Sequence, residues 1–179
     1  MTAPPAPIDA LEIFLQPGEF YFGDGLTRIR TLLGSCVAVV LWQPKLRIGG
    51  MCHFMLPHRS RGNGRKQPLD GRYAEEAMQM FMDELRRTAT SPGQYRARLV
   101  GGGRMFEQPC NLSGAIDICT RNMEAARELI VHHGFALHSQ DMGGHGHRNV
   151  IFDLWSGDVW LKRVPLRRAA AVPAPFANA

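Results

Sequence analysis

Two apolar, strand-like runs on either side of a proline-containing turn constrain the fold of this chain more than any other feature. Residues 34–42 are rich in β-branched and apolar side chains, and residues 47–57 form a second such run that ends at a proline. Pro44 suits the second position of a tight turn because its φ angle is fixed. The pattern predicts a β-hairpin, which brings residues of the two runs side by side.

The predicted hairpin pairs a cysteine with a histidine. If the turn is centred between Pro44 and Lys45, Cys36 and His53 lie equally far from that centre and face each other. Directly opposed residues share a face, with Cβ atoms about 4.5–5.5 Å apart. That approach would let the thiol pass its proton to the imidazole, as in a nucleophile activated by a base. A bulge at residues 49–50 (Gly-Gly) would shift this register.

The segment that leads into Cys36 favours a catalytic role over the alternative of an ordinary buried thiol. Cys36 opens its strand directly after Gly34 and Ser35, which places it at the end of a sheet. Gly34 lets the backbone approach a reacting carbonyl, and the amides of Ser35 and Cys36 could donate to an oxyanion. An imidazolium at His53 would lower the pKa of the thiol, so that thiolate is available near neutral pH. The alternative for His53 is a hydrogen-bonded core histidine.

Two neighbouring residues complete the predicted site. Cys52 points to the face opposite His53, and its predicted partner is Val37, so we interpret Cys52 as structural. Thr31 lies on the strand that precedes Cys36, where a hydroxyl or carbonyl could hold the second imidazole nitrogen, the orienting role in a catalytic triad. Equally, Thr31 could be only a good strand former.

The composition indicates a single domain. The chain has 179 residues, of which 45% are hydrophobic and 21% charged, as in soluble globular proteins. We expect a flexible N-terminus over residues 1–10, one catalytic domain over residues 11–164, and a disordered tail over residues 165–179. No apolar run approaches the roughly 20 residues that span a bilayer. With no secretory signal pattern at the start, we expect a cytoplasmic protein, without membrane insertion, whose four cysteines are free thiols.

The periodicity predicts a layered α+β fold with a mixed or mostly antiparallel sheet and two main helices. The helices are expected at residues 72–88 and 122–133. Thr120 or Asn122 can cap the start of the second helix, and Gly134 can end it in a left-handed conformation. Besides the hairpin, strands are predicted at residues 11–15, 19–22, 28–33, 95–100, 135–140, 149–154 and 159–162.

Other site types have weaker support. The net charge of +5 is not accompanied by a nucleic-acid motif, so no nucleic-acid partner is expected. His145 and His147 lack the further spaced ligands of a zinc site, so we expect no metal. Residues 101–103 (Gly-Gly-Gly) are better explained by a wide turn near the active site than by a phosphate loop. No Gly-x-Ser-x-Gly elbow is present, which argues against a serine hydrolase.

The segments around Cys36 and His53 resemble the signature of the CheD family, the chemoreceptor glutamine deamidases. The resemblance covers about residues 12–163 and includes five segments in order: 33–39 (Leu-Gly-Ser-Cys-Val-Ala-Val), 53–57 (His-Phe-Met-Leu-Pro), 101–106 (Gly-Gly-Gly-Arg-Met-Phe), 122–125 (Asn-Met-Glu-Ala) and 141–152, which begins Asp-Met-Gly-Gly and ends Arg-Asn-Val-Ile-Phe.

The resemblance implies a cysteine hydrolase that converts receptor glutamines to glutamate and needs no cofactor. It also implies an α/β sandwich similar to that of deamidating bacterial toxins. The family's nucleophile falls on Cys36 and its histidine on His53; its threonine is nearest to Thr31, although the family spacing is one residue longer and would fall on Arg30. The expected partners are receptor cytoplasmic helices and a CheC-like phosphatase. A cysteine protease, a transglutaminase and a non-catalytic module that binds such a phosphatase are the alternatives.

Overall fold

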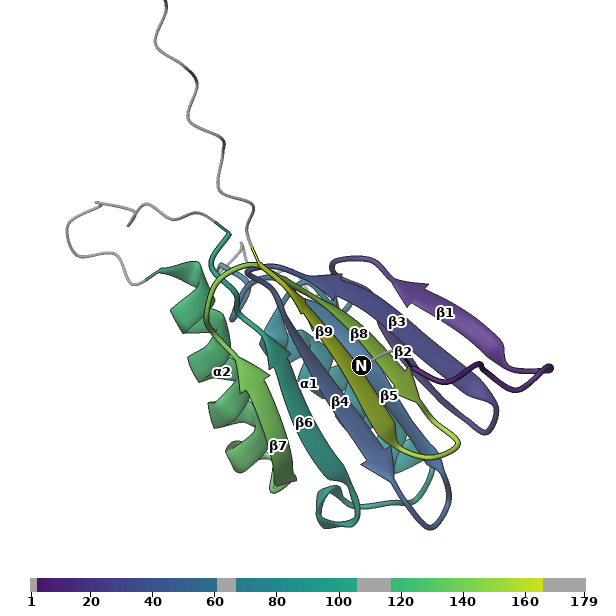
Figure 1. Ribbon diagram of the computed structural model, residues 1–179. Coiled ribbons are helices and arrows are strands. Elements are labelled where there is room, and N and C mark those ends of the chain that lie inside the picture. Colours follow the sequence, from purple (N-terminus) through teal and green to yellow (C-terminus); the bar gives the residue numbers. More distant parts are fainter. Residues whose placement is uncertain (1–2, 61–66, 106–116, 166–179) are drawn as a thin grey trace, which may run out of the picture.

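The strands form two mixed sheets in the computed structural model, which describes residues 3–60, 67–105 and 117–165 (Figure 1). All neighbouring strands are antiparallel except the parallel pairs β1–β3 and β6–β7. The five-stranded sheet has the order β2 (Phe20–Asp24), β5 (Ile48–Phe54), β4 (Val37–Gln43), β6 (Arg96–Gly101) and β7 (Ala136–Met142). The four-stranded sheet has the order β1 (Leu11–Leu15), β3 (Thr27–Leu33), β8 (His147–Asp153) and β9 (Asp158–Val164).

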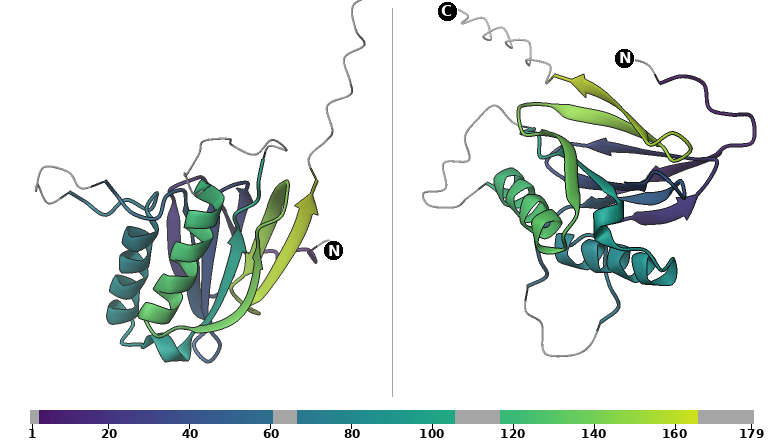
Figure 2. Two further views of the ribbon diagram at one scale, coloured as in Figure 1. Left: turned by 90° about the vertical axis from the view of Figure 1, so that its left-hand side faces the viewer. Right: turned by 90° about the horizontal axis from the view of Figure 1, so that it is seen from below.

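The molecule has three layers, with the five-stranded sheet in the middle (Figure 2). Helices α1 (Ala74–Arg87) and α2 (Ile118–His132) cover one face of this sheet, and the four-stranded sheet covers the other. A short 3-10 helix, Pro92–Gln94, leads into β6. The structure confirms the predicted α+β sandwich with two main helices.

The almost unbroken apolar sequence of strand β4 is explained by its burial on both faces. Val37, Val39 and Leu41 contact the core beneath the helices, whereas Ala38 and Val40 contact the core between the sheets. A strand buried on both faces has no solvent-facing positions, so its residues do not alternate between polar and apolar.

The predicted hairpin forms, but its predicted register is wrong. The last pair before the turn is Gln43 with Ile48, so the loop holds four residues rather than the two expected. The Gln43 side chain accepts a hydrogen bond from the amide of Leu46 at 2.7 Å, and Arg47 has a φ of 54°. These features make a longer loop, and His53 consequently pairs with Ala38 instead of Cys36.

The second helix begins earlier than predicted. Its N-cap is Asp117, whose side chain accepts a hydrogen bond from the amide of Cys119 at 2.7 Å. Thr120 and Asn122, the predicted caps, lie inside the helix. At the other end Gly134 has a φ of 76°, which confirms the left-handed position expected there.

The structure describes the two predicted terminal segments only in part. Residues 1–10 and 165–179 stay predicted as flexible and disordered, and the second of these lies outside the described residues after Pro165. Over the ranges described, none of the helices combines the length and apolar character needed to cross a bilayer. Nor do these ranges contain three or more His, Cys, Asp or Glu side chains grouped as metal ligands.

Candidate active site

Cys36 and His53 lie on the same face of the five-stranded sheet, at one end of the β4–β5 pair. Because the true register differs from the predicted one by two residues, His53 stays on the face of Ala38 and Cys36 and moves to a diagonal position. Diagonal neighbours have Cβ atoms roughly 7–8 Å apart or somewhat less, still within reach of long side chains. Cys36 is half-buried, and His53 is 1% exposed. Both face the four-stranded sheet.

Thr31 joins the histidine from the opposite sheet. Its Oγ1 lies 2.8 Å from His53 Nδ1 and also donates a hydrogen bond to the carbonyl of Leu15 at 2.8 Å. A hydroxyl has one proton, and a carbonyl can only accept. We therefore assign the proton of the imidazole to Nδ1, which donates to Thr31 and leaves Nε2 with its lone pair.

The neutral form of His53 is favoured by its surroundings. Burial lowers its pKa to about 4, and the lowering is opposed by the Leu15 carbonyl and by the negative charge of Glu19. Within the described ranges Nε2 is buried and has no hydrogen-bond partner. His53 is therefore an unprotonated base at neutral pH, with one nitrogen held by Thr31 and the other available.

The thiol is also neutral at rest, which contradicts the expected thiolate. Burial raises the pKa of Cys36 above its usual value, although hydrogen bonds from the Ser35 side chain and the Cys36 amide lower it. No imidazolium stands beside the sulfur to favour the thiolate, because His53 is itself kept neutral by burial. The geometry therefore suits proton transfer during attack rather than a preformed ion pair.

Residues 101–103 lie against the segment of Cys36, near the site as predicted, but they are the end of β6 and its extension rather than the predicted turn. The amide of Gly102 donates to the carbonyl of Cys36 at 2.7 Å, and the amide of Gly103 donates to the carbonyl of Gly34 at 2.8 Å. Among the residues described, no backbone carbonyl accepts the amide of Ser35 or that of Cys36. These two amides thus remain available as donors.

Two of the remaining predicted residues have packing explanations. At Gly34 an added Cβ would lie 2.9 Å from the sulfur of Met105, so the glycine makes room for that side chain. Cys52 is fully buried beneath the helices opposite Val39, not Val37, and burial raises its pKa to about 12. Cys52 therefore fits the structural interpretation, with its partner corrected.

Sequence reasoning missed Asn122 as part of the site. Asn122 is 0% exposed, and its Nδ2 donates to the carbonyl of Met55 at 2.8 Å and to that of Ser35 at 3.3 Å. The available signal was its place on the buried stripe of α2, between Cys119 and Ala126, where a polar side chain is unexpected.

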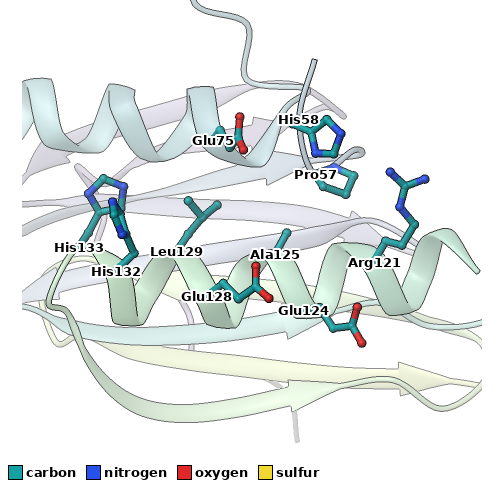
Figure 3. Close-up of a pocket in the computed structure, with 10 residues that line it drawn as sticks. All are labelled: Pro57, His58, Glu75, Arg121, Glu124, Ala125, Glu128, Leu129, His132 and His133. Carbon is teal, nitrogen blue, oxygen red and sulfur yellow. The ribbon is translucent and has the colours of Figure 1, made fainter. Parts of the chain in front are cut away.

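A surface pocket lies elsewhere, between the two helices (Figure 3). It is lined by Glu75 of α1, by residues of α2 and its C-cap, and by Pro57 and His58, and it includes none of the three predicted catalytic residues. Its polar side chains are of mixed charge, with Glu75, Arg121 and several further residues projecting toward the gap (Figure 3). The candidate nucleophile is therefore outside this pocket.

Comparisons with known proteins identify relatives over most of the chain. Residues 55–163 match a family model described as CheD, chemotactic sensory transduction. A protein of Pseudomonas syringae pv. tomato named "Probable chemoreceptor glutamine deamidase CheD" is 46% identical over 89% of this chain and 94% of its own length. One of Dechloromonas aromatica, named "Probable chemoreceptor glutamine deamidase CheD 3", is 47% identical over 87% of this chain and 89% of its own length. A solved structure, of the Bacillus licheniformis hypothetical protein YfiH, matches 70% of this chain and 49% of that chain with 15% identity and a TM-score of 0.42.

Proposed function

This chain belongs to the CheD family, and we propose that it hydrolyses the side-chain amide of glutamines in chemoreceptors, with Cys36 as nucleophile and His53 as base. The single observation that carries the proposed roles is the state of His53. Its Nδ1 is held by Thr31 at 2.8 Å while Nε2, on the side of the sheet shared with Cys36, has no partner within the described ranges. This is the arrangement of an oriented general base.

The first half of the proposed reaction releases ammonia. His53 Nε2 takes the proton of the Cys36 thiol as the sulfur attacks the carbon of the glutamine amide. The carbonyl electron pair moves to the oxygen, where the free amides of Cys36 and Ser35 donate to it. When the carbonyl re-forms, the carbon–nitrogen bond breaks. The imidazolium gives its proton to the leaving nitrogen, and a thioester on Cys36 remains.

The second half releases glutamate. Water loses a proton to His53 Nε2 and attacks the thioester carbon, and the carbon–sulfur bond breaks as the oxyanion collapses. The imidazolium then returns the proton to the sulfur. One water is consumed and one ammonia formed per glutamine, and both side chains return to their starting states. No step calls for a cofactor.

The proposed substrate is a glutamine on the cytoplasmic helices of a receptor, which places the enzyme in the cytoplasm. The net charge of +5 suits an acidic helix surface. The CheC-like partner implied by the resemblance stays a prediction.

Mass spectrometry of a receptor cytoplasmic fragment tests the proposed reaction. After treatment with the wild-type protein, we expect ammonia in solution and the mass increase of a glutamine-to-glutamate conversion. In water labelled with heavy oxygen, the new carboxylate should carry the label, because the thioester is opened by water. A cleaved fragment would indicate proteolysis instead, and a mass gain that requires an added amine would indicate transamidation. An unmodified fragment would overturn the proposal.

Thr31→Val is expected to lower the deamidation rate about ten- to hundred-fold, since misalignment of a catalytic group has effects of this size. Valine has a similar shape but leaves His53 Nδ1 without its acceptor. Thr31→Ser keeps the hydroxyl and is the matched control, with a rate close to that of the wild type. Initial rates of ammonia release measure both. Equal rates in the valine and serine variants would show that Thr31 has no orienting role.

A further inference from the structure

We propose that Asn122 is a positioning residue that holds the Cys36 amide in the direction needed to bind the oxyanion. The inference rests on the proposed function and names a residue outside the predicted Cys36, His53 and Thr31 set. Asn122 comes from α2, in the helical layer, and reaches the two strand ends that carry the nucleophile and the base.

The β4–β5 ladder ends just before the site. Val37 and Phe54 are its last pair. Beyond them, the chain segments at Ser35 and Met55 no longer pair across the ladder, yet they flank Cys36 and follow His53. The Nδ2 group of Asn122 donates to both carbonyls, at 3.3 and 2.8 Å. One side-chain amide thus ties together two segments where the backbone ladder has stopped.

The peptide between Ser35 and Cys36 carries both the carbonyl that Asn122 holds and the Cys36 amide. A trans peptide is planar, so its N–H points opposite to its carbonyl, and the described chain has no cis peptide bond. With the Ser35 carbonyl held by Asn122, the direction of the Cys36 amide is set. That amide lies near the sulfur of its own residue, where it stabilises the thiolate. On the following peptide, the carbonyl of Cys36 is held by Gly102 at 2.7 Å.

The hydrogen-bonding pattern of Asn122 favours its donors. A carboxamide has two N–H bonds and one acceptor oxygen. Both N–H bonds face carbonyls, while Oδ1 is buried and lacks a donor among the described residues. An apolar side chain of similar shape would avoid this unsatisfied oxygen. The two donated hydrogen bonds are therefore the contribution that an apolar residue at this position could not make.

Kinetics of Asn122→Leu and Asn122→Ala separate positioning from folding. Both variants lose the donors and the unsatisfied oxygen, but they differ in volume. We expect kcat for deamidation to fall about ten- to hundred-fold in each, with KM within a few-fold of the wild type. Alkylation of Cys36 by iodoacetamide forms no oxyanion, so its rate at each pH should change far less than kcat, and only through the hydrogen bond from the Cys36 amide to the thiolate. Digestion and mass spectrometry assign the alkylated cysteine.

Ile130→Ala is the matched control for packing of the helix. Ile130 is fully buried on α2, in the core beneath the helices, and its hydrocarbon side chain cannot donate a hydrogen bond to the carbonyls that Asn122 holds. We expect this variant to lose thermal stability and keep its kcat. The positioning role would be overturned by an unchanged kcat in folded Asn122→Leu and Asn122→Ala. It would also be overturned by an alkylation rate that falls in parallel with kcat, or by the loss of cooperative melting in both variants. A wild-type protein that releases no ammonia would overturn the proposed function as well, so the two failures are distinguishable.

Discussion

Cys36→Ala is expected to reduce ammonia release from a receptor fragment by a factor of up to about 10⁶, the size of the effect when the nucleophile of a catalytic triad is removed. Alanine cannot form the thioester, and the remaining amides can only polarise a bound carbonyl. The variant should fold, because Cys36 is half-buried and precedes β4 rather than lying within it. Initial rates with wild type and variant at equal concentration measure the effect.

Cys52→Ala is the matched control for this prediction. Cys52 is fully buried, and burial raises its pKa to about 12, so it contributes packing rather than reactivity. Its replacement leaves a small cavity beneath the helices and should lower the melting temperature while ammonia release continues. If Cys36→Ala retained substantial activity, or if Cys52→Ala lost it while folded, the assignment of the nucleophile would be wrong.

The shared face of Cys36 and His53 could be predicted from the sequence although the register could not. The proline indicated a turn, but the loop length depends on the Gln43 side chain, which accepts from Leu46, and on the positive φ of Arg47. Neither feature has a distinctive sequence signal. The prediction of a common face survived because the error was two residues, and side chains of a strand return to the same face with that period.

Contacts between layers were harder to predict than contacts within the hairpin. The sequence suggested that Thr31 could hold the imidazole, but it gave no means of knowing that β3 belongs to the opposite sheet and passes over His53. Counting along the family spacing indicated Arg30 instead, whose side chain reaches Glu12 on the exposed side. The sequence predicts Asn122 as a possible helix cap, whereas the helix begins at the Asp117 cap and Asn122 contacts the segment of Cys36. In each case, the missing information was the packing of one layer on another.

His53→Gln is expected to lower kcat for deamidation by about 10³-fold or more, toward the upper part of the range for general acid–base catalysis. Glutamine fills much of the same space and can still reach Thr31, but it cannot take up the proton of the thiol. Titration of the thiol should separate this role from misfolding. Cys36 in the variant should still be alkylated at high pH, where the thiolate forms without a base. A variant with near-normal kcat would exclude His53 as the base.

The same variant should also change how the stability of the protein depends on pH. The pKa of His53 is lowered from 6.5 in the unfolded chain to about 4 in the folded protein. Between these values the unfolded state binds a proton that the folded state excludes, so the free energy of unfolding decreases as pH falls through this window. At about 1.4 kcal/mol per pKa unit, this histidine accounts for a loss of about 3 kcal/mol from pH 7 to pH 4. Urea titrations at both pH values should show a loss of stability in the wild type that exceeds the loss in His53→Gln, in which only the carboxylates and other histidines titrate.

The kcat of the wild type should be constant near neutrality and fall only as pH approaches 4, where Nε2 becomes protonated. Equal pH dependence of stability in both proteins, or an acid limb of kcat near 6.5, would show that His53 is exposed to water and is not the buried neutral base assigned here.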